Sequence, residues 1–325
     1  MDNGNPPTSP NDPVRKAGWE HELLERFAFA ALAEQRRARR WGIFFKLFFA
    51  IYFLFLLLVL SGESLTGRGL ASRYTALVDL DGAISSDSLA SAENVMAGLR
   101  GAFEDKATVG VIVRANSPGG SPVQAAYIYD EIKRLRTKYP KIPLYAVVTD
   151  ICASGCYYAL AAADKIYADR ASVVGSIGVL MNGFGFVDGM RKLGVERRLL
   201  TAGEHKGFLD PFSPITAFDR KHAQELLDRV HQQFIERVRQ GRGKRLKESN
   251  DMFSGLYWTG EEALKLGLVD ELGSIAYVAR EVVGAEDIVD FTQHEGVFDR
   301  FARRIGTTMA STLASEIVGR TPVLR

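Results

Sequence analysis

The chain alternates between short apolar runs and longer stretches whose apolar residues recur at helical spacing. Apolar runs at 74–80, 109–114 and 142–148 predict buried β-strands, and helical spacing over 94–103 and 123–138 predicts helices between them. Parallel strands need long crossover connections, which helices of this length supply. The pattern therefore predicts an α/β fold in which helices cover a largely parallel sheet.

The second half of the chain continues this pattern with more helix. It predicts a helix at 157–163, a strand at 165–168, and helices at 219–239 and 261–266. Thr259 is suited to cap the last of these helices, and Gly267 is suited to end it.

The chain before residue 74 has a different character. Residues 1–13 hold four prolines and no sizeable apolar residue after Met1, which predicts a disordered tail. Apolar positions between 19 and 32 recur at helical spacing, and four arginines follow at 36, 37, 39 and 40. We expect an amphipathic helix at a membrane surface, where basic residues favour anionic headgroups; a solvated charged helix is the alternative.

Residues 41–60 form an apolar run that only Gly42 and Lys46 interrupt. At about 1.5 Å per residue such a helix crosses a hydrocarbon core, so we predict a transmembrane helix over 41–61. More arginines precede the run than follow it, which puts residues 1–40 in the cytoplasm and everything after Ser61 outside it. A cleaved signal peptide is less favoured, because the polar leader is about forty residues long.

The other boundaries follow from changes in composition. Residues 62–73 are interpreted as a tether, 74–285 as one globular domain, and 286–325 as a helical extension. Within the extension, apolar residues between 297 and 318 fall on roughly one helical face, with arginines at 300, 303 and 304. We expect this helix to dock on protein; association with a membrane surface is the alternative.

Charge and cysteine content narrow the class of partner. The 41 basic and 39 acidic residues give a net charge of +2, so we expect no nucleic-acid partner. The two cysteines, Cys152 and Cys156, lack the nearby ligands that a zinc site needs, so we expect no metal. We interpret them as buried packing residues, because a bridge between residues four apart on a helix has awkward geometry. An oxidising compartment keeps a disulfide open as the alternative.

Ser154 is the candidate nucleophile. It lies among small residues, where the strand at 142–148 leads into the helix at 157–163. Backbone N–H groups at the start of a helix can stabilise a developing anion. Ordinary helix capping also uses a serine at this position, so this segment alone does not separate the two roles.

Three further segments rich in glycine and small polar residues follow predicted strands, where ligand sites of α/β proteins gather. Pro118-Gly119-Gly120 presents backbone N–H groups with no side chain in the way, as an oxyanion or a peptide backbone requires. Ser176 lies between glycines, and Lys206 lies in a glycine-flanked, non-helical stretch. A lysine buried beside a serine can act as a general base, although most lysines are solvated surface charges.

Together these segments resemble the signal peptide peptidase A family of membrane-anchored serine proteases, peptidase family S49. The resemblance covers about residues 75–280 and implies the Clp protease/crotonase-like fold, built from repeated ββα units. It rests on RANSPGGSP (114–122), ASGCYYALAAADKIYA (153–168), VGSIGV (174–179), the segment around Lys206, and FSGLYWTGEEALKLGLVDELG (253–273).

The resemblance implies a Ser-Lys dyad of Ser154 and Lys206 that needs no cofactor and no metal. Gly120, with Gly119 as the less favoured choice, and Gly155 match the positions whose N–H groups hold the oxyanion. The chain is therefore expected to cleave an acyl bond through a covalent intermediate on the serine.

Three more positions bear on the implied mechanism. Ser176 matches a serine that orients the lysine amine, and His205 is the rival base beside Lys206. Adjacent side chains on an extended segment point to opposite faces, so at most one of the two should reach the serine. Cys156 stands where the family usually has glycine, which leaves the dyad intact and narrows the adjoining pocket. Single-domain members of the family typically form rings in which one subunit's serine meets its neighbour's lysine.

The sequence therefore predicts a serine endopeptidase of the bacterial inner membrane, with its catalytic domain in the periplasm. It is expected to cleave released signal peptides or other unfolded, apolar peptides at the outer face of that membrane. Expected partners are these peptides, the lipid bilayer and further copies of the chain in a ring. Two alternatives use the same fold. A crotonase-like acyl-CoA enzyme would need a catalytic carboxylate and a CoA pocket, and a non-catalytic membrane scaffold would need neither.

Overall fold

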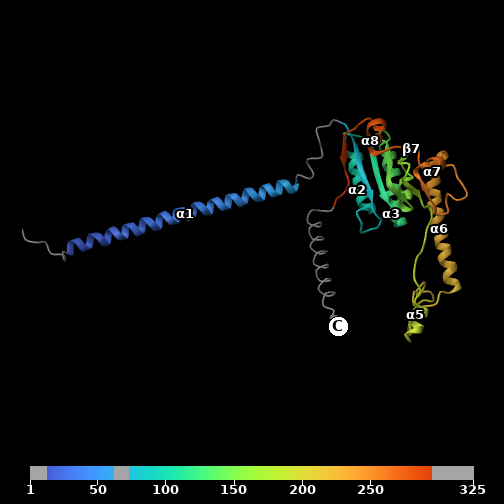
Figure 1. Ribbon diagram of the computed structural model, residues 1–325, viewed down its shortest axis with the longest axis horizontal. Coiled ribbons are helices and arrows are strands. Elements are labelled where there is room, and N and C mark those ends of the chain that lie inside the picture. Colours follow the sequence, from blue (N-terminus) through green and yellow to red (C-terminus); the bar gives the residue numbers. More distant parts are fainter. Residues whose placement is uncertain (1–12, 62–72, 295–325) are drawn as a thin grey trace, which may run out of the picture. The chain divides into compact units, whose positions relative to one another are not determined.

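The computed structural model describes residues 13–61 and 73–294, which fall into two compact units, Met1–Thr66 and Gly67–Arg325 (Figure 1). The predicted extension helix at 297–318 and nearly all of the predicted tail and tether lie outside the described residues.

The first unit contains one helix, α1 (Pro13–Ser61), of 49 residues. The amphipathic stretch at 19–32 and the apolar run at 41–60 were expected as separate helices, and they join here without a break. Pro13 is the first residue of the helix, where a missing N–H costs nothing. Within the described residues, no helix is both long and apolar enough to cross a membrane. The side chains at 57–61 lie outside the described residues.

The second unit is organised around one sheet. In the described residues its strands follow the order β6-β5-β3-β2-β1-β8, and β4 pairs with β3 and β7 beside this path. Every pairing is parallel except that of β5 with β6. The strands are β1 (Tyr74–Asp81), β2 (Thr108–Ser117), β3 (Leu144–Ala153), β4 (Lys165–Ala168), β5 (Val173–Gly175), β6 (Tyr257–Thr259), β7 (Glu271–Leu272) and β8 (Ile288–Asp290).

Helices connect these strands and supply the crossovers that parallel pairing requires. They are α2 (Ala92–Glu104), α3 (Pro122–Lys138), α4 (Gly155–Leu160), α5 (Val187–Lys192), α6 (Ala217–Arg242), η2 (Gly243–Arg245), α7 (Gly260–Leu266), α8 (Ile275–Tyr277) and η3 (Val278–Val283). This mostly parallel α/β sheet fits the Clp protease/crotonase-like fold.

The sheet is buried on both faces. Successive side chains of a strand point to opposite faces, so Ala76 and Val78 of β1 enter the larger core, which also includes residues of α2, α3 and α6. Leu77 and Ile112 point to the other face and share a smaller core with Val278 of η3. Burial on both faces explains why the strands appear in the sequence as continuous apolar runs rather than alternating ones.

The strands and helices predicted between residues 74 and 266 are present, and several of their ends differ from the predicted ones, most clearly at β3 and α4. Strand β3 runs on to Ala153, because its last residues pair with β5 after its apolar run has ended. Helix α4 spans only Gly155–Leu160, whereas 157–163 was expected. The alanines at 161–163 lie beyond the end of the helix but are fully buried, which explains why the apolar run continues through them.

A buried arginine ties the end of α6 to the sheet. The Arg242 guanidinium donates two hydrogen bonds to the Gly267 carbonyl, at 3.0 and 2.9 Å, and one to Asp270 Oδ2 at 2.8 Å. The same carboxylate oxygen accepts the Ile166 N–H of β4 at 2.7 Å. Because the charge is paired and its donors are used, it can remain in the core and anchor α6 there.

Candidate active site

Ser154 occupies the sharp turn between β3 and α4. Its φ is +52° and its ψ is −124°, a conformation that non-glycine residues rarely adopt and that costs about 1–3 kcal/mol. Two backbone hydrogen bonds hold the turn: Ser154 N–H donates to the Gly175 carbonyl at 2.8 Å, and Tyr158 N–H donates to the Ser154 carbonyl at 3.0 Å. The strained turn presents the serine side chain beyond the end of the sheet, into the pocket described below.

Strand register brings the glycine turn after β2 against Ser154. Ser117 pairs with Cys152 after an irregularity in the β2–β3 ladder, so the two chain segments leave the sheet side by side. A Cβ atom added at Gly119 would lie 2.6 Å from the Gly155 nitrogen and 2.8 Å from the Ser154 Cβ. Glycine is therefore required at position 119 by close approach as well as by its φ of +96°.

The same geometry separates the two glycines as oxyanion donors. The N–H of Gly119 already donates to Ser117 Oγ at 3.1 Å. Among the described residues, no hydrogen bond is formed by the N–H of Gly120 or of Gly155. A Cβ on Gly155 would lie 3.2 Å from the Gly120 nitrogen, so the two groups are neighbours. This arrangement favours Gly120 over Gly119 and leaves two unpaired donors beside Ser154.

Strands β5 and β6 bring Ser176 to the opposite side of the turn. Ala153 pairs with Gly175, and Gly175 pairs in turn with Tyr257. Ser176 follows directly, with φ +51° and its N–H bonded to the Leu256 carbonyl at 2.7 Å. Sequence segments that lie more than eighty residues apart thus meet around Ser154.

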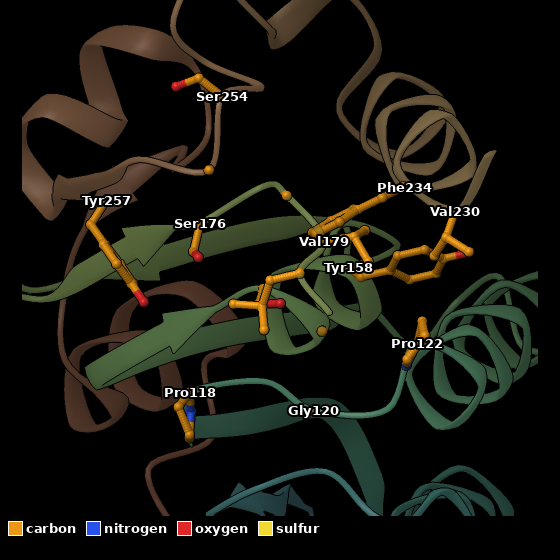
Figure 2. A pocket seen from close by; sticks show the side chains of 15 residues that line it. Pro118, Gly120, Pro122, Tyr158, Ser176, Val179, Val230, Phe234, Ser254 and Tyr257 are labelled. Atoms are coloured by element: carbon orange, nitrogen blue, oxygen red, sulfur yellow. The ribbon is translucent and has the colours of Figure 1, made fainter. Parts of the chain in front are cut away.

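These elements enclose a pocket of about 520 Å³ that contains Ser154, Gly155, Gly120 and Ser176 in its wall. Figure 2 shows Tyr158, Val179, Val230 and Phe234 gathered at one end of the pocket, with Tyr257 and Pro118 toward the other. The volume and the mixture of apolar walls with a few polar groups suit a peptide side chain or a small ligand. None of the lining residues is acidic.

Sequence reasoning did not find the apolar wall of the pocket. The helical pattern of α6 identified Val230 and Phe234 as apolar, but no sequence signal separates a residue that lines a pocket from one that fills the core. Ser254 and Tyr257 lie in a segment, 253–273, that contributed to the resemblance without being given a role. Placing Ser254 and Tyr257 in the pocket wall requires the strand register and the burial that only the folded chain shows.

Lys206 does not join this pocket within one chain. It is exposed and lies in the turns at 204–209. These turns contact the start of α6, where the His205 ring stacks on Phe218 with 3.9 Å between centroids. Phe218 precedes Val230, a pocket residue, by twelve positions, or about 18 Å along the helix axis. That distance exceeds the reach of a lysine side chain, so in this conformation the Lys206 amine does not reach the pocket of its own chain.

The backbone around Lys206 differs from the extended segment that was expected. Lys206 N–H donates to the Gly203 carbonyl at 3.1 Å, and Phe208 N–H donates to the His205 carbonyl at 3.0 Å, so the chain turns here. On such a turn the side chains of His205 and Lys206 are not forced to opposite faces, as they would be on an extended strand. The two residues are separated instead by the stacking of the His205 ring, while the lysine remains in solvent.

The segment between β5 and α6, residues 179–216, is an arm that folds mostly on itself. Phe186 stacks on Phe212 at 5.4 Å, and Ser213 Oγ donates to Asp210 Oδ2 at 2.7 Å, a bond that lowers the pKa of this carboxyl. Figure 1 shows its helix α5 beside the N-terminal end of α6, away from the strands. Large apolar side chains are nevertheless exposed along it: Leu180, Met181, Phe184, Phe186, Leu193, Val195, Leu199, Leu200, Phe212 and Ile215.

The two cysteines are joined by a disulfide, which corrects the expectation of two free packing residues. That expectation assumed that both lie on one helix. Instead Cys152 belongs to the end of β3 and Cys156 to the first turn of α4, and the sharp turn at Ser154 brings their Cα atoms to 5.2 Å. Both residues are buried, as expected.

No group of three or more His, Cys, Asp or Glu side chains within residues 13–61 and 73–294 could hold a metal ion. The site thus offers a serine on a strained turn, two unpaired N–H donors and a pocket. These are the parts that acyl transfer through a serine requires, apart from the base.

Comparison with known proteins assigns the chain to a family. A family model described as "Peptidase family S49" matches residues 136–288. The "Na(+)/H(+) antiporter NhaA" of Brucella abortus is 40% identical over 231 residues, which cover 71% of this chain and 31% of that protein. The "Putative protease slr0021" of Synechocystis sp. is 31% identical over 199 residues, 61% of this chain and 69% of that protein. "Protease 4" of Haemophilus influenzae is 30% identical over 228 residues, 69% of this chain and 36% of that protein.

The chain belongs to peptidase family S49. The matched range contains Ser154, Ser176 and Lys206, whereas the turn at Gly119 and Gly120 precedes it. The chain spans about a third of the Brucella and Haemophilus proteins.

Proposed function

We propose that this chain is a serine endopeptidase whose nucleophile is Ser154. The observation that carries the proposal is the pair of unpaired N–H groups, of Gly120 and Gly155, beside a serine held at φ +52° in the wall of a pocket. Donors fixed in this way stabilise the negative charge that develops on a carbonyl oxygen when a hydroxyl attacks it. Membership of a peptidase family agrees with this chemistry.

In the proposed reaction, Ser154 Oγ attacks the peptide carbonyl and the neutral amine of Lys206 takes the hydroxyl proton. The same amine, now protonated, gives that proton to the leaving amine as the peptide bond breaks, which leaves an acyl-enzyme. A water molecule then attacks the ester and passes a proton to the lysine, which returns it to Ser154 Oγ as the acid product departs. Ser176 orients the lysine amine from the facing wall of the pocket.

We further propose that Lys206 comes from a second copy of the chain. The separation of about 18 Å along α6 argues against a dyad within one chain in this conformation. The arm that carries Lys206 also exposes ten large apolar side chains, among them Leu200 at 96% exposure. Exposed apolar surface of this extent marks an interaction site, and burial against a neighbour would favour the neutral amine.

The proposed substrates are unfolded, apolar peptides such as released signal peptides. Tyr158, Val179, Val230 and Phe234 line one end of the pocket beside Ser154, and none of the lining residues carries a charge. An apolar side chain is therefore expected to enter this end of the pocket. A crotonase-like acyl-CoA enzyme is less well supported, because its catalytic carboxylate has no counterpart among these residues.

A fluorophosphonate probe should label the full-length protein at Ser154, because the reagent reacts with activated serines. We expect a single modified peptide by mass spectrometry and no label in Ser154→Ala. Ser254→Ala is the matched control, because Ser254 also lines the pocket and is given no role in catalysis, and its labelling should be unchanged.

Two outcomes would contradict this proposal. A label on another pocket serine would move the nucleophile, and a protein that folds but takes no label would support a non-catalytic scaffold. Binding of coenzyme A by the same preparation would favour the acyl-CoA alternative.

We also propose that α1 anchors the protein in the bacterial inner membrane, with residues 1–40 in the cytoplasm. The run at 41–60 holds one charge, Lys46, and the apolar side chains described from Trp41 to Leu56 are all exposed in the isolated helix. Such a surface needs lipid or protein to cover it. The peptidase unit would then lie on the outer side.

The full chain should stay in the membrane pellet after alkaline carbonate extraction, because only integral segments resist this treatment. A chain that begins at residue 67 should be released into the supernatant. Protease added to spheroplasts should digest the peptidase unit while a cytoplasmic marker stays intact. Release of the full chain by carbonate would refute the anchor, and protection in spheroplasts would refute its orientation.

A further inference from the structure

A covalent bridge encloses the candidate nucleophile. A disulfide joins Cys152 to Cys156. Cys152 lies at the end of β3, just before Ser154, and Cys156 lies in the first turn of α4, just after it. The bridge therefore closes a small ring of backbone that has Ser154 at its centre. Both cysteines are buried, with at most 1% of their surface exposed, so the bridge belongs to the packing beneath the turn rather than to its surface.

Besides the bridge, two backbone hydrogen bonds fix the main chain of this turn. Ser154 has a positive φ, which a chain without constraint would leave, and α4 is only six residues long. Ser154 N–H and the Ser154 carbonyl each make one backbone hydrogen bond, to Gly175 and Tyr158. Among the described residues, the bridge is the only covalent cross-link between the two sides of the turn.

The two N–H donors also depend on the position of this turn. Gly155 belongs to the ring that the bridge closes. A Cβ atom added at Gly155 would lie 3.2 Å from the Gly120 nitrogen, so the second donor is close by. A displacement of the turn would thus move the serine and one oxyanion donor together, relative to the donor on the facing segment. Catalysis is sensitive to such displacements, because about 1 Å of misplacement can cost about a hundredfold in rate.

We propose that the Cys152–Cys156 bridge is a positioning element of the active site, so that the peptidase is fully active only while the bridge is oxidised. This inference rests on the proposed role of Ser154. When the bridge opens, two thiol groups that no longer share a bond must separate within a packed core, and the turn between them absorbs the movement. An extracytoplasmic location, as proposed above, is an environment in which such a bridge persists.

The chemistry of opening is thiol–disulfide exchange. A dithiol reductant attacks one bridge sulfur as a thiolate, which forms a mixed disulfide and frees the other cysteine. Its second thiol then displaces the remaining cysteine. The bridge gains two electrons and two protons, and the dithiol is oxidised to a cyclic disulfide. Glutathione disulfide reverses the change and leaves two molecules of glutathione.

The test compares the oxidised and reduced full-length protein in detergent. The chain contains only these two cysteines, so a reversible effect of dithiothreitol on the protein must act through them. We expect reduction to lower the rate of fluorophosphonate labelling of Ser154, and kcat for an apolar peptide, by about tenfold or more. KM should change less than kcat, circular dichroism should stay the same, and glutathione disulfide should restore the rate. Alkylation counted by mass spectrometry reports the state of the bridge.

A double variant, Cys152→Ser with Cys156→Ser, should react slowly with or without dithiothreitol. If it fails to fold, the reduced natural protein still decides the matter, because its sequence is unchanged. Two results would overturn the inference: an unchanged rate in protein whose cysteines are both alkylated after reduction, or alkylation of both cysteines without any reductant. An oxidised protein that takes no label at Ser154 would overturn the proposed function itself, and this inference with it.

Discussion

Ser154→Ala and Lys206→Ala chains should each lose peptide hydrolysis by about four orders of magnitude, because removing one member of a catalytic unit disables all of it. An equimolar mixture that is allowed to exchange subunits should recover activity. In a ring with a shared dyad, about a quarter of the sites then combine an intact serine with a neighbour's intact lysine. Hydrolysis of a fluorogenic apolar peptide, measured before and after mixing, checks this result.

Lys221→Ala is the matched control for the loss of a lysine. Lys221 is exposed and lies near the start of α6, where the arm meets this helix. It should retain full activity. Undiminished turnover in either dyad variant would remove that residue from the mechanism. Recovery that never appears on mixing, while the single losses hold, would contradict sharing between chains. A loss in His205→Ala with normal Lys206→Ala would make histidine the base.

Gly120→Ala should reduce kcat by about a hundredfold to a thousandfold with a smaller change in KM, as expected for an oxyanion donor that moves out of position. Gly120 has φ +149°, and an added Cβ would lie 2.1 Å from the Ile84 carbonyl oxygen. A backbone oxygen cannot yield as a side chain can, so the segment must shift and carry its N–H with it. Steady-state kinetics and fluorophosphonate labelling measure the effect.

Gly284→Ala is the control for backbone strain alone. Gly284 ends η3 with φ +77°, and nothing lies within 4 Å of an added Cβ. This variant should lose about 1 kcal/mol of stability, and its kinetics should be normal. If Gly120→Ala loses stability to the same degree yet keeps its kcat, the donor next to Gly155 must be another group.

Most of the fold could be predicted from the sequence because its elements are long and internally patterned. Strands β1 to β3 each contain a run that is mainly apolar, and α2, α3 and α6 repeat their apolar positions over three or more turns. The strands of two or three residues, β5 to β8, carry no period and owe their existence to a partner strand. Their pairing is a property of the sheet rather than of the segment.

The candidate site was predicted unevenly for a related reason. Ser154 and the glycines at 119, 120 and 155 stand in strand-end segments rich in small residues, and the resemblance of several such segments to one family gave them roles. The apolar wall of the pocket was not recognisable, since Val230 and Phe234 look like core residues in a helical pattern. The resemblance already preferred Gly120 over Gly119, and the structure adds a physical reason, the hydrogen bond from Gly119 N–H to Ser117 Oγ.

By itself, the sequence determined an α/β domain of the S49 type, the segment that carries the candidate nucleophile, and a long apolar stretch before the domain. The α/β pattern and the apolar stretch are local properties of residue type and spacing, whereas the S49 type came from the resemblance of several motifs to a known family. Only the tertiary structure decided which segments meet around Ser154, that Lys206 stays away from it within one chain, and that Cys152 and Cys156 are bridged. Those facts depend on strand register, on the length of α6 and on the strained turn at Ser154, because contacts between distant segments are set by packing rather than by local pattern.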